Sequence, residues 1–282
     1  MPPPADNGVC LRVVGLPASP RTRVQAALPG VGVPVSVAIV GEAFGWGIVA
    51  GSSLLLGGLI ALRFTISGRL LGLVMAFGAG VLISAVAYEL VGEAFDTSAG
   101  DGGVALGLFA GALTFFAGDT LIDRMGGADR KSSGGKQVAG APLAIMLGIV
   151  LDGIPETAVI GLSLLEGSGV SVAVISAVFL SNLPESIAAT TGLAKSGWKP
   201  RRILGLWVLV MVVCALASLA GYALLEDASG RTLAVVLAFA GGAVLTMLAD
   251  TMMPEAFEHS GRATGLATTL GFALAFAISS LE

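Results

Sequence analysis

The chain has 282 residues, of which 55% are hydrophobic and 12% are charged, with 41 glycines and a formal net charge of -4. Its mean hydropathy of +0.91 excludes an ordinary soluble domain and indicates an integral membrane protein. The sequence carries no basic patch with interleaved aromatic residues, so we expect no nucleic-acid partner.

Residues 1–40 differ from the rest of the chain because they are rich in proline and glycine. They lack the continuous apolar stretch and small-residue cleavage site of a signal peptide. We interpret them as a flexible extracellular tail or a wrongly assigned translation start, followed by a transmembrane domain over residues 41–282. Cys10 lies in this tail and Cys214 within a predicted helix, so we expect neither a disulfide nor a Cys-x-x-Cys metal site.

Apolar windows of about 20 residues predict transmembrane helices. The fold class that they indicate is an all-α membrane bundle of eight such helices, with no sheet. The predicted helices cover residues 43–62, 70–91, 103–122, 142–165, 170–194, 203–225, 232–253 and 263–281.

The distribution of lysine and arginine predicts the orientation of these helices. One set of alternating loops carries eleven basic residues, namely Arg63, Arg69, Arg124, Arg130, Lys131, Lys136, Lys195, Lys199, Arg201, Arg202 and Arg262. The other side carries only Arg12, Arg21, Arg23 and Arg231. By the positive-inside rule the first side is cytoplasmic, so we expect a multi-pass protein of the plasma membrane with both termini extracellular.

Predicted helices two and seven contain similar sequences. Residues 77–95 and 239–257 share six identities in 19 positions, including Glu-Ala-Phe from Glu93 and from Glu255. An odd number of membrane crossings separates the two helices, so they run in opposite directions. This predicts a 3+2+3 arrangement, in which helices one to three and six to eight form an inverted repeat around helices four and five. Secondary transporters use such repeats and bind their substrate near the midplane.

Helices four and five carry near-copies of one motif, Asp152-Gly-Ile-Pro-Glu156 and Ser181-Asn-Leu-Pro-Glu185. Residues four apart share one helix face, so each motif presents its two polar ends together. An aspartate at the centre of a membrane helix costs about 2.5 to 3.5 kcal/mol, and such residues indicate a functional site by default. Pro155 and Pro184 lack a backbone N–H and leave helix carbonyls without a donor. Carboxylates and carbonyls together predict a cation site.

These features resemble the ZIP (Zrt/Irt-like) divalent metal transporters over residues 43–282. In that family helix four usually reads His-Asn-x-Pro-Glu-Gly, helix five carries a polar pair before x-Pro-Glu, and both supply a binuclear metal site. Asp152 stands where the histidine is expected, and Glu156 matches the glutamate. Ser181 and Asn182 occupy the polar pair, and Glu185 matches the second glutamate.

The sequence departs from the family pattern in helix four, which has no histidine and places Gly153 where asparagine is expected. Helix six supplies no carboxylate before Glu226. We therefore expect one principal metal ion, bound by Asp152, Glu156 and Glu185, with Asn182 and Ser181 completing the shell. The loop over residues 123–141 has no histidine, so we expect no metal capture there.

An all-oxygen shell favours manganese, ferrous iron or magnesium, whereas imidazole and thiolate ligands favour zinc. Zinc also accepts carboxylates. The resemblance implies zinc as the first substrate, with manganese or iron as alternatives, moved into the cytoplasm. It implies no enzymatic activity and no cofactor, membrane lipid as the surroundings, and a homodimer as one oligomeric option.

Functions of other classes remain as alternative hypotheses. An intramembrane aspartyl-type protease would need two aspartates on separate helices, and Asp119 with Asp152 is the nearest pair. A rhomboid-like serine protease lacks a base, because His259 lies at a predicted helix border, far from Ser163. A cation/calcium exchanger also contains Pro-Glu motifs, but in distant halves of its chain, whereas the two motifs here are 29 residues apart. A non-transporting metal sensor differs from a transporter by the absence of flux.

Overall fold

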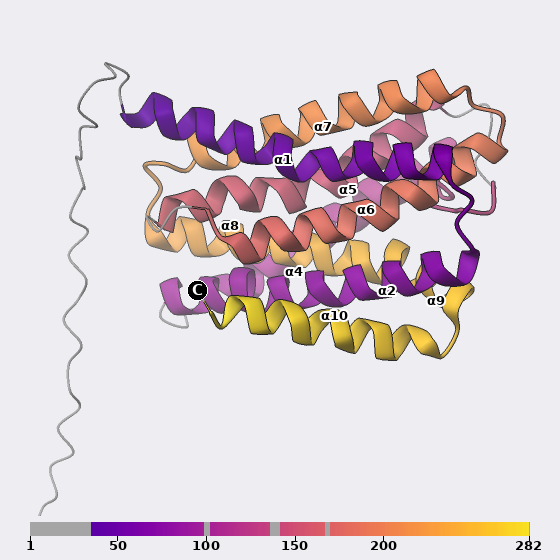
Figure 1. The fold of residues 1–282 in the computed structure, drawn as a ribbon. Coiled ribbons are helices and arrows are strands. Elements are labelled where there is room, and N and C mark those ends of the chain that lie inside the picture. The colour runs from indigo at the N-terminus through magenta and orange to yellow at the C-terminus, as the bar shows by residue number, and fades with distance from the viewer. Residues whose placement is uncertain (1–34, 99–101, 136–141, 167–169, 282) are drawn as a thin grey trace, which may run out of the picture.

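The computed structural model describes residues 35–98, 102–135, 142–166 and 170–281, and within these ranges it is all helical, with no strand. The helices lie side by side along a common axis (Figure 1). They are α1 (Val35–Arg63), α2 (Gly68–Ala85) with η1 (Val86–Gly92) and α3 (Glu93–Ser98), α4 (Gly103–Ile122) with η2 (Asp123–Gly127), α5 (Pro142–Ser163) with η3 (Leu164–Glu166), α6 (Val172–Lys195), α7 (Pro200–Ala223), α8 (Gly230–Met247) with η4 (Leu248–Met252) and α9 (Met253–Ser260), and α10 (Ala263–Ser279).

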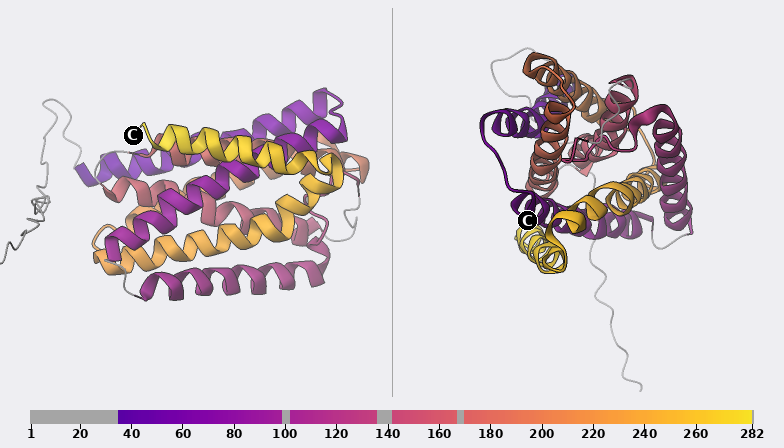
Figure 2. Two further views of the ribbon diagram at one scale, coloured as in Figure 1. Left: turned by 90° about the horizontal axis from the view of Figure 1, so that it is seen from below. Right: turned by 90° about the vertical axis from the view of Figure 1, so that its right-hand side faces the viewer.

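Seven of these helical rods are long and apolar enough to cross a membrane, and the eighth, α10, is a shorter apolar helix. The chain is therefore a multi-pass membrane protein. Large apolar side chains on α4 and α10 face outwards, with Leu106 74% and Leu266 79% exposed, as expected for helices in contact with lipid. Figure 2 shows α10 at the edge of the bundle.

The first helix begins earlier than predicted. It starts at Val35 rather than at residue 43, so the last residues of the predicted tail are helical. Residues 35–40 contain neither proline nor a charge, and nothing in them ends the helix. Residues 1–34, with Cys10, lie outside the described part of the chain.

Two pairs of helices pack through matching glycine contacts. A Cβ on Gly80 of α2 would overlap the carbonyl oxygen of Thr268 on α10, and one on Gly242 of α8 would overlap the carbonyl oxygen of Leu108 on α4. Hydrogen in place of a side chain lets these backbones approach closely. Gly80 and Gly242 are paired in the alignment of residues 77–95 with 239–257, so the same sequence position makes the same contact twice.

The rods of α2 and α8 each change to a π-helical turn at equivalent points. The turn begins at Val86 in one rod and at Leu248 in the other, which are the tenth residues of the two aligned segments. Single π turns inside α-helices often occur at functional sites, because they redirect the side chains that follow.

Helices α5 and α6 bring the two Pro-Glu motifs into the bundle. Each continues through its proline as one helix. Of the seven candidate spans, α6 has the largest buried share, 67% of its apolar window. The motif residues are therefore enclosed by the other helices rather than by lipid.

Candidate cation site

Four of the five predicted ligands converge in the region between α5 and α6. Asp152 and Glu156 of α5 are 2% and 3% exposed, and Asn182 and Glu185 of α6 are 2% and 6% exposed. The four-residue spacing within each motif places these side chains on the inward faces of their helices. The structure therefore confirms that they are buried inside the bundle.

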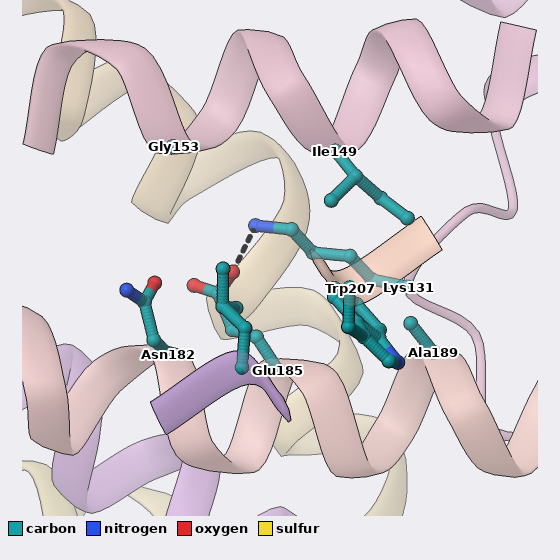
Figure 3. Close-up of a pocket in the computed structure, with 8 residues that line it drawn as sticks. Lys131, Ile149, Gly153, Asn182, Glu185, Ala189 and Trp207 are labelled. Atoms are coloured by element: carbon teal, nitrogen blue, oxygen red, sulfur yellow. Dashed lines mark ion pairs between the residues drawn. The ribbon is translucent and has the colours of Figure 1, made fainter. Parts of the chain in front are cut away.

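A cation of the protein itself joins the carboxylates of the two helices. The ammonium nitrogen of Lys131 lies 2.9 Å from Oε2 of Glu185 and 3.3 Å from Oδ2 of Asp152. Figure 3 shows the Lys131 side chain reaching between α5 and α6 towards Glu185. Lys131 lies in the stretch over residues 128–135 that follows η2, and its 6% exposure shows that this stretch folds into the bundle.

Its neighbour Arg130 binds other members of the same carboxylate cluster, which consists of Asp119, Asp123, Asp152, Glu156 and Glu185. The Nε and Nη2 groups of Arg130 donate to the two oxygens of Asp152, each at 2.9 Å. The same guanidinium donates to Asp119 and lies 3.5 Å from Oδ1 of Asp123. Gly148 of α5 makes room for it, because a Cβ there would overlap the arginine side chain.

Both loop cations keep their charge. Burial by itself would lower the pKa of Arg130 and of Lys131, because a low dielectric disfavours the charged form. Asp152 and Asp119 together outweigh burial at Arg130, and Asp152 and Glu185 together outweigh it at Lys131, so the pKa of each is raised above its ordinary value. Neither group loses its proton near neutral pH.

The two cations do not satisfy the whole cluster. Both carboxylate oxygens of Glu156, Oε1 of Glu185 and Nδ2 of Asn182 are buried without a hydrogen-bond partner. Uncompensated buried charge costs several kcal/mol, so these oxygens require a proton or a cation. If every group is ionised, the cluster has five negative charges, from Asp119, Asp123, Asp152, Glu156 and Glu185, against two positive ones, from Arg130 and Lys131, a net charge of -3.

Ser181 and Gly153 take structural positions beside this cluster. The Ser181 hydroxyl donates to the carbonyl oxygen of Val178 on its own helix, at 3.0 Å. A Cβ on Gly153 would lie 3.0 Å from the Cys214 sulfur of α7. Gly153 therefore faces a neighbouring helix.

Three cavities are lined by residues of this cluster or by its two cations. One of about 10 Å³, room for about one water molecule, is lined by Lys131, Asn182 and Glu185. Another of about 20 Å³ lies between Glu156 and Glu89 of η1. A larger one, of about 150 Å³, has Arg130 and Lys131 in its wall together with Asp250, Glu255 and Glu258.

The acidic side chains are arranged around the two cations rather than around an empty centre. Within the ranges that the structure describes, no three His, Cys, Asp or Glu side chains are placed to hold a metal ion together. A metal ion that used Asp152 and Glu185 together would have to take the place of the Lys131 ammonium.

Contacts at the end of the bundle hold the segment that carries these cations. The backbone N–H of Ser133 donates to Glu255 at 2.8 Å, and the Ser133 hydroxyl lies 2.6 Å from Nε2 of His259. Lys195 of α6 donates to the Ser133 carbonyl oxygen at 2.9 Å. His259, expected at a helix border, thus fixes the loop that enters the site.

The cation site predicted from the sequence does not include Asp119, Arg130 or Lys131. Asp119 enters there only as a partner of Asp152 in a protease, and Arg130 and Lys131 only as basic residues of the cytoplasmic loops. A signal was present, because several carboxylates in apolar helices require counter-ions, and Arg130-Lys131 is the nearest basic pair before helix four. The sequence could not show that this pair turns into the bundle. Comparison of the chain with protein-family models and with curated proteins gives no match.

Proposed function

We propose that the chain is a divalent transition-metal transporter related to the ZIP family. The observation that supports this most is the set of buried carboxylate oxygens without donors, on Glu156 and Glu185, from two adjacent proline-containing helices. Buried oxygens of this kind suit a cation that arrives from outside the protein. Zinc is the first substrate of the proposal, and manganese and iron are the alternatives.

Glu156, Glu185 and Asn182 form the centre of the proposed metal site. Asn182 would offer its carbonyl oxygen, and the two glutamates would offer three unpartnered carboxylate oxygens. Asp152 takes part through the oxygen that it shares with Lys131, and Ser181 would join by its hydroxyl oxygen. An arriving ion of charge +2 would offset most of the -3 of the ionised cluster.

The proposed transport fold is the 3+2+3 inverted repeat. The matched glycine contacts and the matched starts of η1 and η4 support an equivalence of helices two and seven. The path would lead from Glu89 past Glu156 to the cavity with Glu255. In the proposed orientation the Arg130 loop faces the cytoplasm of the cell, both termini lie outside, and two copies associate as a homodimer.

The alternative functions fit the geometry of the site less well. An aspartyl-type protease needs Asp119 and Asp152 to act on a substrate together, whereas here the guanidinium of Arg130 binds both of them. Ser163 donates its hydroxyl to the Ile160 carbonyl and has no base beside it among the described residues. For an exchanger, the two motifs would belong to separate halves, but α5 and α6 are adjacent helices.

Uptake of radioactive zinc and manganese into proteoliposomes tests the proposal. Glu156→Gln and Glu185→Gln should each abolish uptake. Glu226→Gln is the matched control, because Glu226 is an exposed carboxylate that accepts a hydrogen bond from Tyr222. This variant should transport normally. Glu156→Gln should not lower the melting temperature, because it removes a buried charge without a partner. Wild-type vesicles that take up neither ion would refute the proposal.

A further inference from the structure

Arg130 and Lys131 are neighbours in the chain but bind the cluster in different ways. Arg130 contacts Asp119, Asp123 and Asp152, and its planar guanidinium binds Asp152 through two parallel hydrogen bonds. Lys131 has one short contact, to Glu185, and longer ones to Asp152 and to Thr251, the last at 3.4 Å. A two-point guanidinium pair fixes geometry, whereas an ammonium on a flexible stem changes partners readily.

Lys131 also borders a second group of carboxylates. It lines the small cavity with Asn182 and Glu185, and it lines the larger cavity beside Asp250, Glu255 and Glu258. Lys131 therefore borders both the carboxylates of α5 and α6 and an acidic cavity at the end of the bundle. If the Lys131 ammonium left Glu185, it would still lie among carboxylates, so its charge would not be buried without a partner.

We propose that Lys131 is a tethered competitor for the transported ion, which occupies Glu185 and Asp152 until a divalent metal displaces it into the acidic cavity. This inference rests on the proposed function. Arg130 remains on Asp152 and Asp119 throughout and keeps the loop in place. Lys131 keeps its proton in this exchange, because the ammonium moves as a charged group and the metal takes over the carboxylate oxygens of Glu185 and Asp152.

The exchange gives Lys131 a role in specificity. A monovalent ion offers Glu185 no more charge than the ammonium that it would replace. A divalent ion offers twice that charge and also reaches the unpartnered oxygens of Glu156. Lys131 therefore lowers the affinity of the site for any arriving cation. Monovalent ions are then rejected, and divalent ions are bound less tightly than by the carboxylates alone.

Acylation of lysine in the purified full-length protein tests the displacement. Sulfosuccinimidyl acetate is added with and without zinc or manganese, and labelling of each lysine is followed by mass spectrometry. Lys131 is buried in the metal-free protein and should react slowly, and metal should raise its labelling rate by about tenfold or more. Lys199, which is exposed, is the internal control and should react equally with and without metal.

Metal binding to two variants separates this inference from the proposed function. Lys131→Met should bind zinc or manganese about tenfold more tightly than wild type, and Lys199→Met should bind like wild type. If metal binds wild type but neither raises Lys131 labelling nor binds Lys131→Met more tightly, the competitor role is wrong and the transporter proposal stands. If neither wild type nor Lys131→Met binds a divalent ion, both proposals fail.

Discussion

Arg130 and Asp152, 22 residues apart in the chain, form a two-point ion pair in which each carboxylate oxygen accepts one hydrogen bond of 2.9 Å. The pair is buried, with Arg130 1% and Asp152 2% exposed. It attaches the stretch after η2 that carries Arg130 to the centre of α5. Asp152, one of the predicted ligands, is therefore bound to an internal cation.

Loss of the guanidinium should destabilise the protein strongly. In Arg130→Gln the carboxylates of Asp119 and Asp152 lose their shared counter-ion, which we expect to cost about 3 to 5 kcal/mol. The measurement is thermal unfolding in detergent. Arg124→Gln removes an exposed arginine from the same stretch and should unfold like wild type. Equal melting temperatures for the two variants would show that the buried pair contributes no stability.

Gly148 is predicted to be irreplaceable because of Arg130. An added Cβ would overlap the arginine side chain, and forcing an extra methyl group into a packed interior costs about 1 to 3 kcal/mol. Gly148→Ala should therefore lower the melting temperature. Gly205→Ala in α7 is the matched control, since a Cβ there meets nothing within 4 Å. The control should be neutral or slightly stabilising, because alanine favours the helix, and a stable Gly148→Ala would contradict the packing.

Gly80→Ala and Gly242→Ala should destabilise the protein to a similar extent. Each new Cβ would overlap a backbone carbonyl of the neighbouring helix, and backbone cannot move aside as a side chain can, so we expect about 1 to 3 kcal/mol for each. Chemical unfolding in detergent measures both losses. A large loss in one variant and none in the other would count against equivalent roles for α2 and α8.

The charge of Lys131 predicts a loss of stability only in strong alkali. Its pKa in the folded protein is raised above the ordinary value of 10.5, because Asp152 and Glu185 outweigh the effect of burial. Its contribution is therefore complete below pH 10.5 and is lost as pH rises through the higher folded value. Melting temperatures of wild type and Lys131→Met should show an additional alkaline decrease in wild type alone. An additional decrease already between about pH 8 and 9 would contradict this.

Several features of the protein followed from local sequence. Long apolar stretches fixed the number and approximate ends of the helices, because a membrane span requires length and apolarity and little else. The four-residue spacing of Asp152 with Glu156 placed both on one face, and burial of the motifs followed from the cost of exposing carboxylates to lipid. Residues 77–95 and 239–257 pointed to equivalent helices, and both carry a π turn at the same position.

The tertiary structure alone decided which cations neutralise those carboxylates. Arg130 and Lys131 lie outside any periodic pattern of apolar residues. The sequence around them therefore does not indicate whether they face solvent or the interior. Their burial depends on the gap at Gly148 of α5, on the position of Asp119 on α4 and on the contacts of Ser133 with α9, and these three features belong to different helices. Charge pairing acts through space, and the order of residues does not specify which partners meet.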